Sequence, residues 1–188
     1  MFEYIHPSIE RGSTFTAEDL RHFTRRLDLP PAESIQANYE AVHSAVLLNR
    51  RAPAAASGAL FEQCIYDAMC RSGVDPSWIQ TGVDLADGNN AEADFVISVP
   101  SRGRRAVFVK VSLRERWKQI DRDAMVIGYR HNDLRDNMSL IFLREHLGDS
   151  IGQATRKAAV TAQQCYARLS VHTALDHAAI GAWLGGLL

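Results

Sequence analysis

Asp94 and Lys110 are the residues of this sequence whose types and spacing most directly suggest chemistry. Asp94 begins the β-rich run Asp-Phe-Val-Ile-Ser-Val, and Lys110 lies near the end of a second run, Ala-Val-Phe-Val-Lys-Val. The residues between the runs predict a short hairpin loop in which Gly103 has a positive φ. If the hairpin is centred on Arg102, Asp94 pairs with Lys110 on one face of the sheet, with Cβ atoms ~5 Å apart. Burying charged side chains on apolar strands costs free energy unless the charges pair with each other or take part in catalysis. A catalytic pair and a plain salt bridge therefore both fit.

The order of an Asp, a hairpin and a Lys on the next strand resembles the core of the PD-(D/E)XK nuclease superfamily. The resemblance implies that Asp94 binds Mg²⁺ and that Lys110 positions and polarises the attacking water. It also implies a restriction-endonuclease-like fold. In this superfamily the second acid normally lies two residues before the Lys. Here that position is Phe108, which cannot bind a metal.

The EcoRII-like type II restriction endonucleases, one branch of this superfamily, carry the second acid on the helix after the Lys strand. That branch has a Lys-x-Ser/Thr-x-x-x-Arg-Trp-x-Gln run, and residues 110–119 read Lys-Val-Ser-Leu-Arg-Glu-Arg-Trp-Lys-Gln. Asp123 follows on the same helix face as Arg116 and Gln119. The resemblance makes Asp123 the second metal ligand, with Glu115 as the competing acid, while Arg116 is expected to clamp the phosphate. Without the resemblance, the carboxylates of this helix would be expected on a solvated face.

Glu62 is a third candidate ligand. The segment from Arg50-Arg-Ala to Ser-Gly-Ala-Leu-Phe-Glu62 resembles the small-residue lead into a helix with a Phe-Glu pair in the same enzymes. Their Glu faces the active site and completes the outer ligand shell of the metal, which implies this role for Glu62. A surface Glu is the alternative. The resemblance covers roughly residues 50–143.

Basic residues are concentrated near this candidate site. The segment 102–123 holds eight basic and three acidic residues, although the whole chain has a net charge of −1 and a pI of about 6.6. A basic patch on an otherwise acidic protein fits an enzyme that binds DNA phosphates only at its active site. A donor-rich loop over residues 129–135 is a further candidate for base contacts. The residues expected to contact DNA are Arg102, Arg104, Arg114, Lys118, Arg130 and Asn132.

Hydrophobic periodicity predicts the elements that hold these residues. Helices are expected over 16–27, 33–50 and 58–71, with a small-residue connector over 52–57. Strands are expected over 78–84, 94–99 and 106–111, followed by a helix over 113–127 and a strand over 138–143. The last forty residues are predicted to be helical. This order indicates an α/β fold with a mixed sheet flanked by helices, with a helical N-terminal extension (1–50) before the nuclease core (51–188).

Length and composition limit the class of protein and the compartment that we expect. A chain of 188 residues with 46% hydrophobic residues can bury one good-sized core. The three cysteines form no CxxC pair, which favours reduced thiols in a cytoplasmic protein. The longest apolar stretch is far shorter than the ~20 residues of a membrane span.

The expected function is that of a small type II-like restriction endonuclease acting on double-stranded DNA with Mg²⁺, as part of a restriction system. A palindromic site would imply a homodimer. The alternatives are a repair or recombination nuclease, the nuclease subunit of a defence assembly, or an inactive nuclease fold that binds DNA or protein.

Overall fold

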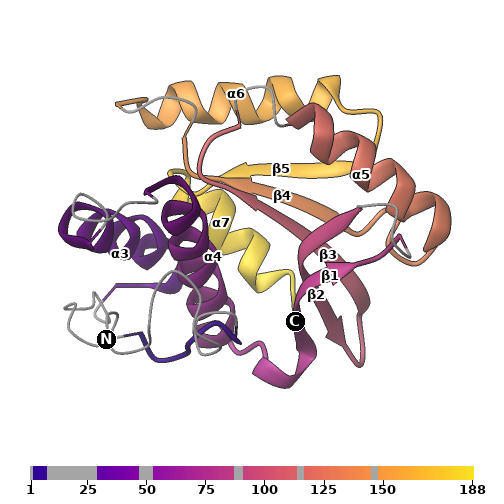
Figure 1. The fold of residues 1–188 in the computed structure, drawn as a ribbon, viewed down its shortest axis with the longest axis horizontal. Helices are drawn as coiled ribbons and strands as arrows, with labels where there is room; N and C mark the ends of the chain where they lie inside the picture. The colour runs from indigo at the N-terminus through magenta and orange to yellow at the C-terminus, as the bar shows by residue number, and fades with distance from the viewer. Residues whose placement is uncertain (1, 8–28, 47–52, 87–90, 114–116, 145–147) are drawn as a thin grey trace.

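The computed structural model describes residues 2–7, 29–46, 53–86, 91–113, 117–144 and 148–188, arranged as a β-sheet between two layers of helices (Figure 1). In chain order the elements are α3 (Pro31–Val46), α4 (Pro53–Arg71), the 3₁₀ turn η2 (Pro76–Trp78), β1 (Ile79–Asp84), β2 (Glu92–Val99), β3 (Gly103–Lys110), α5 (Trp117–Arg130), β4 (Met138–Phe142), α6 (Ile151–Gln164), β5 (Leu169–Thr173) and α7 (His177–Gly185).

The sheet is mixed, as predicted. Its strand order is β1-β2-β3-β4-β5; β1, β2 and β3 pair antiparallel, whereas β4 pairs parallel to both β3 and β5. Since parallel neighbours need a crossover, α5 connects β3 to β4 and α6 connects β4 to β5. The expected α/β class is confirmed.

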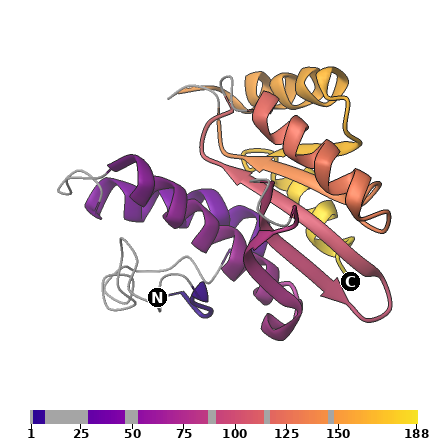
Figure 2. The ribbon, with the colours of Figure 1, turned by 45° about the vertical axis from the view of Figure 1, so that its right-hand side comes forward.

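Both faces of the sheet are buried, which explains the continuous apolar runs in β2 and β3. Phe95, Ile97 and Val107 pack with α3, α4 and α7 in one core, whereas Val96 and Phe108 pack with α5 and α6 in the other. Figure 2 shows α3 and α4 on one side of the sheet and α5 and α6 on the other. Within the described part of the chain, no helix is long and apolar enough to cross a membrane.

Three expectations about the elements are wrong. The connector over 52–57 is helical from Pro53 onward, because Pro suits the first position of a helix and Ala has the highest helix propensity. The last forty residues are not all helical, since Leu169–Thr173 forms β5. The hairpin is centred one residue earlier than expected, because Ser98 pairs with Arg104 and Val99 pairs with Gly103. Gly103 has the predicted positive φ, at 78°.

Two other expectations concern the N-terminal part. The helix over 16–27 lies outside the described residues. The boundary near residue 50 also lies there and stays a prediction. The described helix α3 packs into the same core as α4 and α7.

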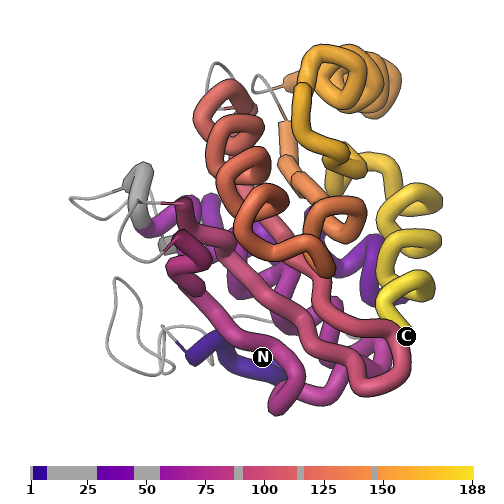
Figure 3. Tube along the Cα trace, turned by 90° about the vertical axis from the view of Figure 1, so that its right-hand side faces the viewer, coloured from indigo at the N-terminus to yellow at the C-terminus, as the bar shows by residue number. Residues whose placement is uncertain are grey.

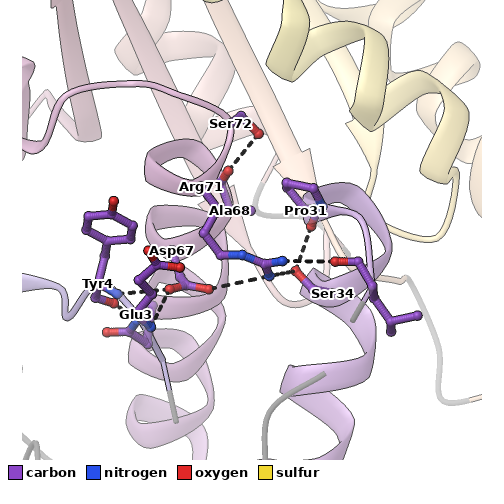
Figure 4. A network of polar contacts seen from close by, with 10 residues as sticks. Glu3, Tyr4, Pro31, Ser34, Asp67, Ala68, Arg71 and Ser72 are labelled. Atoms are coloured by element: carbon purple, nitrogen blue, oxygen red, sulfur yellow. Dashed lines mark hydrogen bonds and ion pairs between the residues drawn. The ribbon is translucent and has the colours of Figure 1, made fainter. Parts of the chain in front are cut away.

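A polar network fixes α4 against the segments before it. Asp67, which is buried, accepts hydrogen bonds from the backbone N–H groups of Glu3 and Tyr4 at 2.9 and 3.0 Å (Figure 4). Arg71 donates to Ser34 Oγ at 3.0 Å and to the Leu29 carbonyl at 2.9 Å. These bonds hold α4 in place, and α4 is the helix that carries Glu62.

Candidate active site

The candidate site lies where the sheet divides. The pairing between β2 and β3 ends at Phe95 and Val107. Beyond that point β2 continues to Glu92 paired only with β1, and β3 continues to Lys110 paired only with β4. The two strands therefore separate at the ends that carry Asp94 and Lys110.

Asp94 bridges the divided strands. Its Oδ2 accepts a hydrogen bond from the Val109 backbone N–H at 2.6 Å, so the carboxylate satisfies a donor that the separated strand β2 no longer satisfies. The same oxygen lies 3.0 Å from Lys110 Nζ, and Oδ1 lies 3.4 Å from it. The expected Asp94–Lys110 contact therefore forms, although the hairpin register differs from the expected one by two residues. Strand side chains alternate with a period of two, so this shift leaves both residues on one face.

A cleft of about 400 Å³ opens at this position. It is lined by residues from β2, β3 and α5: Glu92, Asp94, Phe108, Lys110, Gln119, Ile120 and Asp123. The stripe expected on α5 is confirmed, because Ile120, Ala124 and Ile127 are buried against the sheet. This packing turns the adjacent face of α5, which carries Gln119 and Asp123, into the cleft. The structure thus brings Asp123 to the same cleft as Asp94 and Lys110.

The acidic residues of α5 do not lie on a solvated face. Asp123 is only 7% exposed, and its Oδ1 accepts a bond from Arg122 Nη2 at 3.2 Å. Asp121 is also buried and points away from the cleft, where its two oxygens accept bonds from the backbone N–H groups of Tyr166 and Ala167 at 3.1 and 2.8 Å. Asp121 therefore stabilises the turn after α6, whereas Asp123 lines the cleft.

Glu62 approaches the same residues from α4. Burial, together with the negative charges of Asp94 and Glu92, raises its pKa to about 7, and the positive charge of Lys110 opposes this rise. The Glu62 side chain is partly buried rather than fully exposed, and its expected role in the outer ligand shell stays a prediction. The candidate site thus combines several carboxylates with one ammonium group.

Glu92 was not singled out from the sequence. It lies two residues before Asp94 on β2 and lines the cleft. Its Oε1 would be 3.1 Å from a Cβ at Gly82, so the missing side chain of Gly82 makes room for this carboxylate. The signal that could have found Glu92 is strand alternation, since every second residue faces the same side.

The expected residues that follow Asp94 in the chain have different outcomes. Arg114, Glu115 and Arg116 are outside the described residues, so their expected roles stay predictions. Phe108, at the position of the missing acid, is 2% exposed and packs into the core under α5 and α6. Lys118 is exposed at the start of α5, beside the cleft residue Gln119.

The remaining candidates for DNA contact lie at the far end of the sheet from the cleft. Arg104 donates two hydrogen bonds to Asp133, at 2.7 and 3.0 Å, which ties the hairpin to the turn before β4. Along β3, Arg104 is about 20 Å from Lys110, at roughly 3.3 Å per residue. Arg102, Arg130 and Asn132 are exposed near this same end. The structure does not bring these four residues to the cleft.

The site's donors suit a hard divalent cation. Among the described residues, no three His, Cys, Asp or Glu side chains form a ready-made metal cage. Mg²⁺ does not need one, because it is bound through one or two carboxylates, retained waters and substrate phosphate. The carboxylates of Glu92, Asp94 and Asp123, which line one cleft, fit this mode of binding.

No protein-family model matches the chain, and no curated protein matches it. Its fold is similar to that of a solved restriction endonuclease PspGI–substrate DNA complex, with 13% sequence identity and a TM-score of 0.49. The similarity covers 90% of this chain and 87% of the other. This similarity concerns the fold alone.

Proposed function

We propose that this chain is a Mg²⁺-dependent endonuclease that hydrolyses phosphodiester bonds in double-stranded DNA at a short specific site, as a small type II-like restriction enzyme does. The observation that carries the proposal is the contact of Asp94 with both Val109 N–H and Lys110 at the mouth of a cleft that Asp123 also lines. A homodimer would suit a palindromic site.

The carboxylates would hold the metal. Asp94 Oδ2 is engaged by Val109 and Lys110 at 2.6 and 3.0 Å, whereas Oδ1 has the longer contact of 3.4 Å with Lys110, so this carboxylate would keep donor capacity for the metal. Asp123 would supply the second carboxylate from α5, and Glu62 would bind in the outer shell. When bound, Mg²⁺ would lower the pKa of a water and neutralise charge that develops on the phosphate.

The other residues would position the reactants. Lys110, held by Asp94 at 3.0 Å, would orient the nucleophilic water and donate a hydrogen bond to it. Phe108 provides an apolar wall of the cleft, which limits bulk water beside the reacting groups. Arg116 would bind the phosphate through two parallel hydrogen bonds.

Incubation of the purified protein with supercoiled plasmid and Mg²⁺ tests this proposal. Discrete linear fragments support a site-specific endonuclease. Nicks or cuts at unusual structures would instead indicate a repair or recombination nuclease, or a nuclease subunit that needs its assembly. Asp94→Asn protein serves as the control for contaminating nucleases.

The buried Phe108 supports a second candidate, a nuclease fold that binds DNA or protein without cutting. The superfamily acid missing at this position would then have no replacement. Binding of duplex DNA without cleavage at any Mg²⁺ concentration would favour this candidate.

A further inference from the structure

The outward side of α5 carries a stripe of exposed residues that the proposed chemistry does not use. Lys118, Arg122, Met125 and Tyr129 follow one another at spacings of four, three and four residues, so they share one helix face. The side chain of Arg122 is 68% exposed, and Met125 and Tyr129 are 50% and 84% exposed. In Figure 3, no other element lies in front of α5.

The stripe carries positive charge only. Both acidic residues of α5, Asp121 and Asp123, are buried and engaged in hydrogen bonds. The exposed charges of this helix are therefore Lys118, Arg122 and Arg130, of which Arg122 is ion-paired with the buried Asp123 at 3.2 Å. A surface with this charge is complementary to a polyanion.

The stripe starts beside the candidate site. Gln119 and Asp123, on the adjacent face of α5, line the cleft and directly follow Lys118 and Arg122 in the chain. Arg122 also donates hydrogen bonds to Asp123. The 14 residues of α5 span about 21 Å, which matches roughly six base pairs of duplex. On the other side of the stripe lies Tyr166, which is 87% exposed and whose backbone is held by Asp121.

We propose that this stripe of α5, together with Tyr166, binds the part of the DNA substrate that continues out of the cleft. This inference rests on the proposed nuclease function. Lys118 and Arg122 bind phosphates, while Tyr129 and Tyr166 pack against the sugar–phosphate edge and donate their hydroxyl groups to it. These contacts supply affinity and position, and sequence is read elsewhere.

A second copy of the chain is a poorer occupant for this surface. A two-fold dimer through the stripe would place the same face against itself. Lys118 and Arg122 would then meet like charges from the other copy, without an exposed acid on α5 to offset them. A polyanion would place negative charges against Lys118 and Arg122, so this repulsion would not arise.

Salt dependence of DNA binding tests the inference. Fluorescence anisotropy with a labelled duplex and Ca²⁺ gives the slope of log affinity against log salt concentration for the wild type, Lys118→Gln and Arg122→Gln. Each substitution should reduce the magnitude of this slope by about 0.9, the effect of one lost phosphate contact. Tyr129→Ala should weaken binding and leave the slope unchanged, because the residue is neutral. Arg156→Gln, on the exposed side of α6, is the matched control and should change neither quantity.

The outcomes separate this inference from the proposed function. If the wild type binds no duplex, the proposed function and the inference both fall. If the wild type binds but Lys118→Gln and Arg122→Gln keep its slope, the inference alone is wrong. Light scattering provides a further test. If Tyr129→Ala converts a dimer to a monomer and the slopes stay unchanged, the stripe binds a second copy of the chain and the inference is also wrong.

Discussion

The carboxylate of Asp94 accepts a hydrogen bond from the backbone N–H of Val109 at 2.6 Å, at the point where β2 and β3 stop pairing. One side chain thus closes the gap in the sheet and at the same time holds the ammonium of Lys110. This double role means that Asp94 affects both stability and the proposed chemistry, and that the choice of substitution decides which effect is observed.

Asp94→Asn should be more stable than Asp94→Ala, whereas both variants should be inactive. The amide oxygen of Asn can still accept the Val109 N–H, whereas Ala leaves this donor without a partner at a cost of about 1–3 kcal/mol. Both variants should lose plasmid cleavage, because neither has a charged ligand for the metal. Urea unfolding followed by circular dichroism, together with the plasmid assay, measures both effects. Equal stability of the two variants would show that the Val109 contact contributes little.

Asp123→Asn and Asp121→Asn form a matched pair on α5. Asp123→Asn should raise the Mg²⁺ concentration needed for cleavage or eliminate cutting, because Asp123 lines the cleft. Asp121→Asn should leave the Mg²⁺ requirement unchanged but lower the free energy of unfolding by about 1–3 kcal/mol, because an amide cannot accept both backbone N–H groups as the carboxylate does. Mg²⁺ titrations of cleavage and urea unfolding test the pair. A normal Mg²⁺ requirement in Asp123→Asn would remove it from the proposed ligands.

Glu62 should make stability depend on pH. Its pKa is about 7 in the folded protein, mainly because of burial, against an ordinary value of 4.5. The folded protein therefore keeps a proton that the unfolded chain releases between about pH 4.5 and 7. The free energy of unfolding should fall as pH rises through this window, by about 3 kcal/mol.

Glu62→Gln removes this contribution. The variant should match the wild type near pH 4.5 and exceed its stability above pH 7 in the absence of metal. The measurement is urea unfolding of both proteins at a series of pH values. Subtracting one free energy of unfolding from the other removes the contribution of the other titrating groups, which the two proteins share. Parallel profiles for the two proteins would show that Glu62 titrates normally.

Much of the site could be predicted because strands alternate strictly. The hairpin register was misplaced by two residues, yet Asp94 and Lys110 remained on one face, since only an odd shift would separate them. The same alternation would have identified Glu92. The apolar stripe of α5 could also be predicted, because Ile120, Ala124 and Ile127 recur at helical spacing.

Other features depend on contacts between distant segments. Strand β5 is five residues long and pairs parallel with β4, so little in its local sequence marks it as a strand. Asp121 and Asp123 differ by only two positions, but one contacts the turn after α6 and the other lines the cleft. The rotation of α5 against the sheet decides which of these two residues has a structural role. That rotation depends on the packing of the whole sheet, so the local sequence does not reveal it.

We propose that Lys110, held by Asp94, acts in a Mg²⁺-dependent cleavage of DNA. The most direct measurement compares the wild type with Lys110→Ala on supercoiled plasmid, with Mg²⁺ or with EDTA, after circular dichroism has shown that both proteins fold. We expect the wild type to cleave with Mg²⁺ only, and Lys110→Ala not to cleave even where it still binds the plasmid. Cleavage by Lys110→Ala at a rate near that of the wild type, or cleavage by the wild type in EDTA, would contradict this proposal.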